Sequence, residues 1–320
     1  MKLRSGVLLT LIWTQCATAS LLFAQAGEQS AMKQAEPSAA VSNLDQLIEQ
    51  YTPLQERPPY NGINITRDVR YGPAERNMAD IFTPVTPSSA PRPVLLFVHG
   101  GGFTRGERQF PHGLPFYDNI GVWAVRHGFI GINMTYRLAP QFKWPAGAED
   151  VGSAVRYLIA SVASQGGDPH AIYLMGHSAG AVHAATYLSH PELQGPAGTG
   201  VAGAILVSGA YDIATLPLGD REKAYFGEEA SKYGEQSSIH GLVESTVPLL
   251  IANAEHDPPM FLQQAAELRS ALTAANRPSV TMLMLDGHSH LSTVMSINTK
   301  DTALSSAIES FVTDRPKHGL

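Results

Sequence analysis

Two glycine-rich turns, each directly after a short apolar run, constrain this 320-residue chain most. The first is His-Gly-Gly-Gly at 99–102, which follows the apolar run 94–98. The second is Gly-His-Ser-Ala-Gly at 176–180, which follows the apolar run 171–175 and leads into a small-residue stretch. A strand, a tight glycine turn and a helix in that order predict a serine held at the edge of a parallel sheet.

The two turns are informative as a pair. Composition alone produces a G-x-S-x-G in roughly one or two such chains in ten, and an ordinary glycine turn would then explain it. The His-Gly-Gly-Gly turn is roughly tenfold rarer, and turns of this kind aim main-chain N–H groups at a developing oxyanion. We therefore predict a nucleophile, Ser178, and an oxyanion hole formed by the N–H groups of Gly101, Gly102 and Ala179. The residues expected to support both turns are His99, Gly100, Gly176, His177 and Gly180.

A serine nucleophile needs a base, and the base needs an acid that orients it. In a strand–turn–helix architecture of this type, the acid follows the serine on a loop after a later strand. Asp257 follows the apolar run 248–253 and is the expected acid. Asp212 and Glu255 are its rivals, although Asp212 also suits a turn or a helix cap.

The base is expected on the next loop, Asp-Gly-His-Ser-His at 286–290. We expect His290 to be the base and His288 to be a polar loop residue, although both lie in this loop. His177 is expected to pack in or line the site. His99 is expected to order its glycine turn by hydrogen bonding.

From residue 94 onward, apolar runs alternate with helical patterns, which predicts a mostly parallel sheet covered on both faces. Two antiparallel strands precede it and complete an eight-stranded α/β sheet. The expected strands are 66–71, 77–82, 94–98, 129–134, 172–175, 203–207, 248–253 and 280–285. The expected helices are 44–51, 117–127, 148–163, 179–189, 260–275 and 302–312. The polar stretch 213–245 is either an excursion over the ligand-binding edge of the sheet or a surface loop of no consequence.

Composition favours one large domain. With 44% apolar and 16% charged residues, the chain suits a single α/β domain, expected at 66–320. Residues 27–65 would form a linker and an N-terminal segment near the site entrance. The formal net charge of −6, without basic runs, does not support nucleic-acid binding. The sequence leaves open whether the chain forms a homo-oligomer.

The first 26 residues have the pattern of a secretory signal peptide. A basic start with Lys2 and Arg4 precedes a short apolar stretch, and small residues allow cleavage after Ala19 or Ala26. A retained N-terminal anchor is the alternative. We expect an exported protein, periplasmic or secreted by a bacterium, with no membrane span once the signal is removed. The single cysteine, Cys16, would leave with the signal, so no disulfide is expected.

These residues, in this order, resemble the α/β-hydrolase superfamily, and more narrowly the hormone-sensitive-lipase-type and feruloyl-esterase-like (BD-FAE) bacterial esterases. The resemblance covers about residues 66–312. Further segments that carry it are 136–140, 144–151, 167–169, 254–258 and 287–290. It implies an α/β-hydrolase fold with at most a small cap, because the N-terminal region lacks obvious amphipathic helices. Segment 287–292 looks closer to the feruloyl-esterase-like and arylformamidase branches than to the lipase branch.

The residues and the resemblance together predict a hydrolase of small carboxylic esters, with short-chain acyl, aryl or acetylated-sugar groups. Ser178 would form an acyl-enzyme, His290 would move the proton, and Asp257 would orient His290. No metal or organic cofactor is expected. An arylformamidase-type amidase would use the same residues, and a catalytically silent hydrolase fold that only binds a ligand is a third hypothesis.

Overall fold

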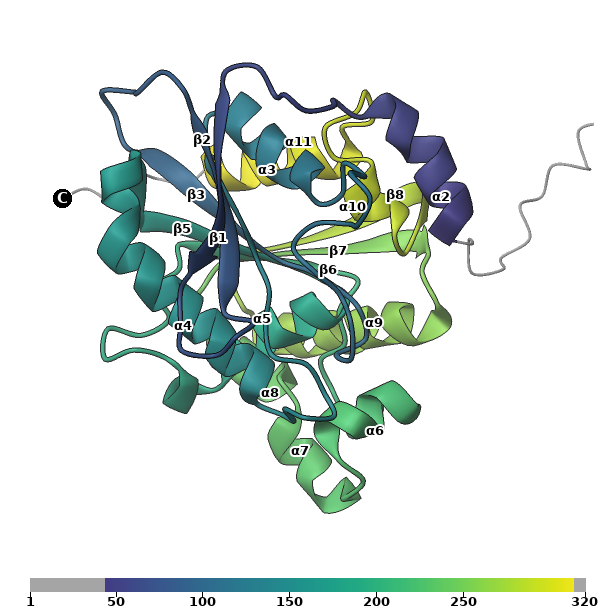
Figure 1. Ribbon diagram of the computed structural model, residues 1–320. Helices are drawn as coiled ribbons and strands as arrows, with labels where there is room; N and C mark the ends of the chain where they lie inside the picture. Colours follow the sequence, from purple (N-terminus) through teal and green to yellow (C-terminus); the bar gives the residue numbers. More distant parts are fainter. Residues whose placement is uncertain (1–43, 314–320) are drawn as a thin grey trace, which may run out of the picture. The chain divides into compact units, whose positions relative to one another are not determined.

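A single eight-stranded sheet organises the computed structural model, which describes residues 44–313 (Figure 1). Its strands are β1 Ile63–Arg70, β2 Met78–Pro84, β3 Arg92–Val98, β4 Ile130–Met134, β5 Gly167–His177, β6 Gly203–Val207, β7 Leu249–His256 and β8 Val280–Ser289. They lie in the order β1-β2-β4-β3-β5-β6-β7-β8. The β1–β2 and β2–β4 pairs are antiparallel and the other pairs are parallel. The predicted eight-stranded, mostly parallel sheet is confirmed.

Helices cover both faces of the sheet. They are α2 Leu44–Tyr51, α3 Asp118–Arg126, α4 Ala146–Ser161, α5 Ala179–Ser189, α6 Asp220–Phe226, α7 Tyr233–Gln236, α8 Ile239–Glu244, α9 Pro259–Ala274, α10 Ser292–Met295 and α11 Ala303–Thr313. Helices α4, α5, α8 and α9 contribute to one buried apolar cluster, and α2, α3, α10 and α11 contribute to the other (Figure 1). Each cluster lies on its own face of the sheet. This is the layered arrangement that alternating strands and helices predict.

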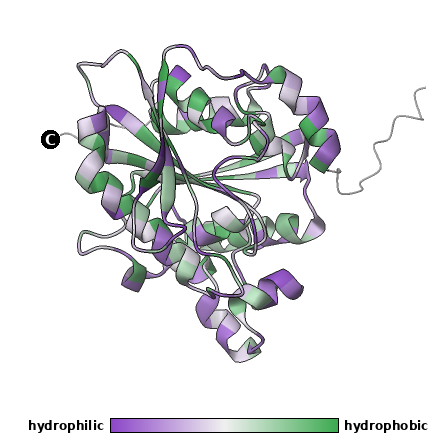
Figure 2. Ribbon diagram, in the orientation of Figure 1, coloured by the Kyte–Doolittle hydropathy of each residue, from purple (hydrophilic) through white to green (hydrophobic). Residues whose placement is uncertain are grey.

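The pattern of burial along each strand explains its place in the sheet. From Val94 to Val98, strand β3 is an unbroken apolar run whose side chains alternate between the two clusters, as a strand buried on both faces requires. Strand β1 alternates buried or half-buried with exposed residues, which suits an edge strand. In Figure 2 the central strands carry mostly hydrophobic colours, whereas α6 is largely hydrophilic.

The observed elements differ from the predicted ones in several places. Strand β5 runs over Gly167–His177, where a strand over 172–175 was expected. Strands β7 and β8 continue past their apolar runs, because their pairing persists as far as His256 and Ser289. The stretch 213–245, for which the sequence predicted no regular element, contains the short helices α6, α7 and α8. Three of their apolar residues, Tyr225, Phe226 and Leu242, are buried, which a polar average over this stretch conceals.

Two predictions concern residues outside the described range. The expected signal peptide, 1–26, and the first part of the expected linker and N-terminal segment, 27–43, lie before residue 44. Export of the protein therefore stays a prediction. Between residues 44 and 313, no helix is long and apolar enough to cross a bilayer.

Candidate active site

A sharp turn between β5 and α5 carries Ser178. Its backbone has φ 55° and ψ −122°, a conformation rarely adopted by residues with a side chain. A β-carbon on Gly180 would lie 2.1 Å from the carbonyl oxygen of Val98, and one on Gly176 would lie 2.3 Å from the carbonyl oxygen of Gly180. Glycine is therefore required on both sides of the serine, and this accounts for the G-x-S-x-G spacing.

The loop that follows β3, here called the glycine loop (residues 99–106), lies against this turn. A β-carbon on Gly100 would come within 3.1 Å of Ser178 Cβ. Gly101 and Gly102 have φ of 133° and 59°, and a β-carbon on Gly101 would lie 2.0 Å from the carbonyl oxygen of Arg105. Ala179 opens helix α5, so its N–H has no acceptor within the helix. The structure thus brings the three predicted oxyanion donors to the neighbourhood of Ser178.

Three side chains from distant parts of the chain meet at this turn. His290 Nε2 lies 2.8 Å from Ser178 Oγ, and His290 Nδ1 lies 2.7 Å from Asp257 Oδ1. Because an ionised carboxylate only accepts hydrogen bonds, Nδ1 carries the proton and Nε2 is free to accept one from the serine. The ring of Phe261 stacks on His290, with centroids 4.6 Å apart. The arrangement can withdraw a proton from the serine hydroxyl as the oxygen attacks.

Asp257 is buried and well supplied with hydrogen-bond donors. Its Oδ2 accepts from the Ser208 hydroxyl at 2.7 Å, the Ala254 N–H at 2.9 Å and the Asn253 amide at 3.2 Å. Burial alone would raise the pKa of Asp257, but its hydrogen bond to His290, the charge on that ring and the other donors lower it below the ordinary value. Asp257 is thus held as a carboxylate. Neither Ser208 nor Asn253 was predicted from the sequence, since nothing in their local sequence indicates a contact with Asp257.

The rival residues make other contacts. Glu255 is exposed and accepts a hydrogen bond from the main-chain N–H of Gly287 at 2.7 Å. Asp212 accepts from the N–H of Ala214, two residues on, as a turn-forming aspartate does. His288 points away from the serine, with its ring nitrogens 3.1 Å from Ser292 Oγ and 3.0 Å from Asp301 Oδ2.

Two further buried histidines flank the site. His177 donates from Nε2 to the main-chain carbonyl of His290 at 2.8 Å. His99 stacks on Tyr136, with ring centroids 4.4 Å apart, and its Nδ1 lies 2.6 Å from the carbonyl oxygen of Gly100. Burial lowers the pKa of His177 and of His99 to about 3, and the nearby His290 adds to the shift of His177. Both rings are therefore neutral near pH 7, and each makes the kind of contact predicted for it.

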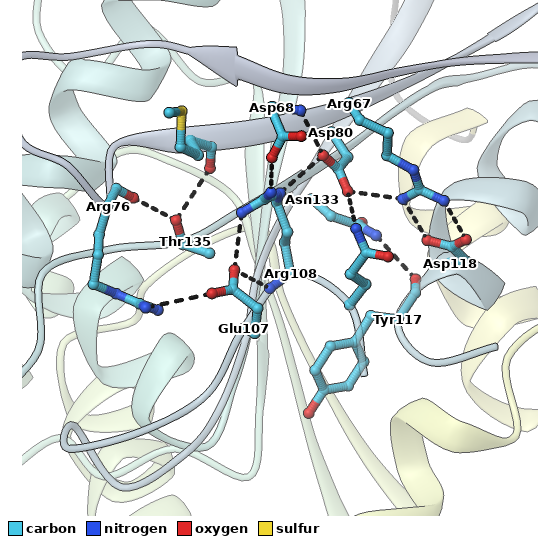
Figure 3. A network of polar contacts seen from close by, with 12 residues as sticks. Arg67, Asp68, Arg76, Asp80, Glu107, Arg108, Tyr117, Asp118, Asn133 and Thr135 are labelled. Carbon is cyan, nitrogen blue, oxygen red and sulfur yellow. Dashed lines mark hydrogen bonds and ion pairs between the residues drawn. The ribbon is translucent and has the colours of Figure 1, made fainter. Parts of the chain in front are cut away.

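A polar network ties the end of the glycine loop to the sheet (Figure 3). Arg108, just beyond the loop, donates to the fully buried carboxylate of Asp80 on β2 at 2.8 Å. Arg67 on β1 donates to the other Asp80 oxygen at 2.7 Å. Arg76 donates to the carbonyl oxygen of Gly106 at 2.8 Å and also pairs with Glu107. A buried carboxylate is tolerated only when paired in this way, so the network fixes where the loop ends.

Helix α6 packs on the other side of the glycine loop. Tyr225 stacks on Phe103 of the loop, with ring centroids 4.7 Å apart and an interplanar angle of 3°. The carbonyl oxygen of Tyr225 accepts a hydrogen bond from the N–H of Trp144 at 2.9 Å. Of the two possibilities left open for stretch 213–245, the structure favours the first, since α6 lies against the loop beside Ser178.

Two hollows in the described region lie apart from these three side chains. One, of about 360 Å³, is lined by residues that include Arg137 and Asp150, and the other, of about 480 Å³, lies beside α6. Within residues 44–313, no group of three or more His, Cys, Asp or Glu side chains is arranged to hold a metal ion.

Comparison with known proteins relates this geometry to known hydrolases. The BD-FAE family model matches residues 79–194, the part of the chain that contains the glycine loop and the Ser178 turn. The chain has the α/β-hydrolase fold. Among solved structures, this α/β hydrolase is similar to esterase B from Lactobacillus rhamnosis (TM-score 0.66, 17% identity, 92% of this chain and 94% of that one). It is also similar to a bacterial heroin esterase (TM-score 0.61, 24% identity, 84% and 88%). At these identities the likeness shows the shared fold.

Curated proteins similar to this chain include formamidases and esterases. The chain is 29% identical to a kynurenine formamidase of Danio rerio over 218 residues, which are 65% of this chain and 69% of that protein. It is 28% identical to the esterase LipQ of Mycobacterium tuberculosis over 245 residues. That match takes in 70% of this chain but only 56% of LipQ, so this chain spans little more than half of that relative.

Proposed function

We propose that this α/β hydrolase is a serine esterase that cleaves small carboxylic esters through an acyl-enzyme. One observation supports the proposal above the others: His290 bridges Ser178 Oγ at 2.8 Å and the Asp257 carboxylate at 2.7 Å. A hydroxyl, an imidazole and a carboxylate connected in this way form the arrangement that activates a serine for attack on a carbonyl.

In the acylation step, Ser178 Oγ attacks the ester carbonyl carbon while His290 Nε2 takes the hydroxyl proton. Asp257 stabilises the positive charge that forms on the imidazole. Negative charge develops on the carbonyl oxygen, where the N–H groups of Gly101, Gly102 and Ala179 would receive it. Main-chain donors fixed by the glycine loop need little reorganisation, and one such donor typically changes turnover by roughly 10²–10³-fold.

The remaining steps reuse the same groups. His290 returns its proton to the alcohol oxygen as the carbon–oxygen bond breaks, and the alcohol leaves. Water then attacks the acyl-enzyme, with His290 accepting the water proton and passing one to Ser178 Oγ as the acid departs. We propose short-chain acyl, aryl or acetylated-sugar esters as substrates. The similarity to proteins described as esterases, including a carbohydrate esterase from gut microbiota, supports this class.

Labelling and turnover test the proposal together. A fluorophosphonate probe should label Ser178, and Ser178→Ala should abolish both labelling and hydrolysis of 4-nitrophenyl acetate. Ser164→Ala, at an exposed serine that bonds only its own turn, is the matched control and should keep both signals. Activity that persists in Ser178→Ala would refute the nucleophile. Failure of the parent protein to react with the probe would favour the catalytically silent alternative.

An arylformamidase activity is the second candidate, and the similarity to kynurenine formamidases supports it. Ser178 Oγ would attack the N-formyl carbon while His290 takes its proton and Asp257 orients the ring, and His290 would then protonate the leaving amine. Side-by-side values of kcat/KM for N-formylkynurenine and phenyl acetate separate the two. A value at least tenfold higher for the formamide would replace the esterase proposal.

A further inference from the structure

The side chain of Arg221, the second residue of α6, packs over the glycine loop. A β-carbon on Gly102 would lie 2.9 Å from Arg221 Cδ and 3.5 Å from one of its guanidinium nitrogens. Gly102 is one of the predicted oxyanion donors. It lies two residues from Gly100, where an added β-carbon would lie 3.1 Å from Ser178 Cβ. The guanidinium therefore borders the place where a bound ester would sit.

The backbone beneath Arg221 is firmly held. Tyr225, four residues on, stacks on Phe103 of the glycine loop, and the carbonyl oxygen of Tyr225 accepts from Trp144. At the start of α6, the Glu222 carboxylate accepts from the N–H of Gly219 at 3.0 Å. The helix and the loop are thus packed as one unit, and Arg221 is presented to the site from a fixed position.

The guanidinium of Arg221 forms no ion pair within the described part of the chain. Arg67, Arg76 and Arg108, in the network at the end of the glycine loop, are each paired with a carboxylate. Arg221 is exposed, and no acidic side chain between residues 44 and 313 pairs with it. Its neighbour Glu222 is engaged in capping the helix instead. A guanidinium stays charged at every working pH and offers five donors in a planar fork.

We propose that Arg221 binds a carboxylate, or a comparable anion, carried by the substrate, so that the enzyme prefers acidic esters to neutral ones. This inference rests on the proposed function. A guanidinium fork matches a carboxylate through two parallel hydrogen bonds, which fixes orientation as well as charge. The alternative is that the aliphatic part of the Arg221 side chain packs over the glycine loop and the guanidinium binds no substrate group. The two differ in one respect, because a covering role makes no distinction between a charged substrate and its neutral isostere.

Paired substrates test the proposal on either side of the ester bond. One pair is 4-carboxyphenyl acetate with 4-carbamoylphenyl acetate, which carry the charge or its isostere on the alcohol side. The other is mono(4-nitrophenyl) adipate with 4-nitrophenyl hexanoate, which differ on the acyl side. The measured quantity is the ratio of kcat/KM, anionic over neutral, in the parent protein, Arg221→Gln, Arg221→Lys and the control Lys223→Gln. Lys223 is an exposed cation on the same helix.

We expect Arg221→Gln to lower the ratio roughly three- to tenfold in at least one pair, as loss of a partly exposed charged hydrogen bond should. Arg221→Lys should recover part of the loss, and Lys223→Gln should leave the ratio within twofold. Added salt should weaken the preference of the parent protein. An unchanged ratio in both pairs, with the neutral esters still hydrolysed, overturns this inference alone. Absence of hydrolysis of all four esters by the parent protein overturns the proposed function and this inference with it.

Discussion

His177 donates a hydrogen bond from its ring Nε2 to the main-chain carbonyl of His290 at 2.8 Å. The residue before the nucleophile therefore holds the loop that carries the proposed base. The two rings lie close, with centroids 4.9 Å apart. Since burial keeps His177 neutral, it can steady His290 without adding a second positive charge beside the imidazolium that forms during catalysis.

Removing this contact should slow the chemical step. We expect His177→Phe to lower kcat about tenfold with KM within threefold, because a hydrogen bond to a buried carbonyl is worth about 1–1.5 kcal/mol. His177→Gln, which can still present an N–H, should recover part of the rate. The acid limb of the kcat profile should stay in place, because the pKa of His177, about 3, lies below the assay range. A rise in KM that equals the loss in kcat would contradict the positioning role.

A matched pair of variants distinguishes Asp257, the proposed acid, from its neighbour Glu255. Asp257→Asn should lower kcat by roughly 10³–10⁴-fold, because the amide favours the wrong imidazole tautomer and cannot stabilise the imidazolium. Glu255→Gln should change kcat only a few-fold, since Glu255 bonds the main chain of Gly287 and not the ring. Steady-state hydrolysis of 4-nitrophenyl acetate measures both. Equal losses in the two variants would refute Asp257 as the acid.

The network in Figure 3 predicts unequal contributions from two arginines. Arg108→Gln leaves the buried Asp80 carboxylate short of a partner and should lower the free energy of unfolding by about 2–4 kcal/mol. Arg126→Gln removes an exposed pair with Glu56 and should cost less than about 1 kcal/mol. Urea unfolding followed by circular dichroism gives both values. Equal costs would show that Asp80 does not depend on Arg108.

Tight packing at the serine turn predicts unequal effects for two glycine-to-alanine substitutions. A methyl group at residue 180 would lie 2.1 Å from the Val98 carbonyl oxygen, so Gly180→Ala should destabilise the fold by at least about 3 kcal/mol. A β-carbon on Gly234 meets nothing within 4 Å, and Gly234→Ala in helix α7 should be neutral or stabilise by about 0.5–1 kcal/mol. Thermal melts distinguish the two. A Gly180→Ala protein that melts like its parent would contradict the described turn.

Buried histidines predict loss of stability in mild acid. Burial lowers the pKa of His99, His177 and His183 to about 3, against an ordinary value of 6.5. Between these values the unfolded chain binds more protons than the folded one. Stability is therefore complete above pH 6.5 and falls as the pH drops toward 3, by up to about 1.4 kcal/mol per pH unit for each histidine.

Urea unfolding at pH 7, 6 and 5 checks this dependence. His183→Phe, which replaces a ring packed among aromatic side chains, should reduce the slope of stability against pH. A substitution at the exposed His240 should leave the slope unchanged. The same slope in all three proteins would mean that other groups govern acid sensitivity.

Local sequence was sufficient for much of the fold. The apolar run ending at Val98 and the glycine spacing around Ser178 determine strand, turn and helix within a few residues, so their positions could be predicted closely. Chain order and loop position selected Asp257 and His290 from among their neighbours. In the structure these two contact each other, whereas the neighbours Glu255 and His288 contact Gly287 and Asp301. The roles assigned to these residues await the experiments above.

What the sequence did not reveal depends on contacts between distant segments. The Ser208 hydroxyl meets Asp257 because β6 and β7 are neighbours, and no property of residue 208 alone indicates this. Helix α6 is short and polar, and it is fixed by the stacking of Tyr225 on Phe103, 122 positions earlier in the chain (225 − 103). Periodicity cannot detect a helix of seven residues whose stability comes from another segment.

The stacking of Tyr225 on Phe103 also restricts how this enzyme could evolve toward a new substrate. A mutation that tilts α6 to admit a bulkier molecule would also shift the glycine loop. The N–H groups of that loop that are predicted to bind the oxyanion would then move as well. Changes in selectivity made through the α6 backbone would then alter turnover as well. Exchange of single exposed side chains, such as that at position 221, could change selectivity and leave the glycine loop in place.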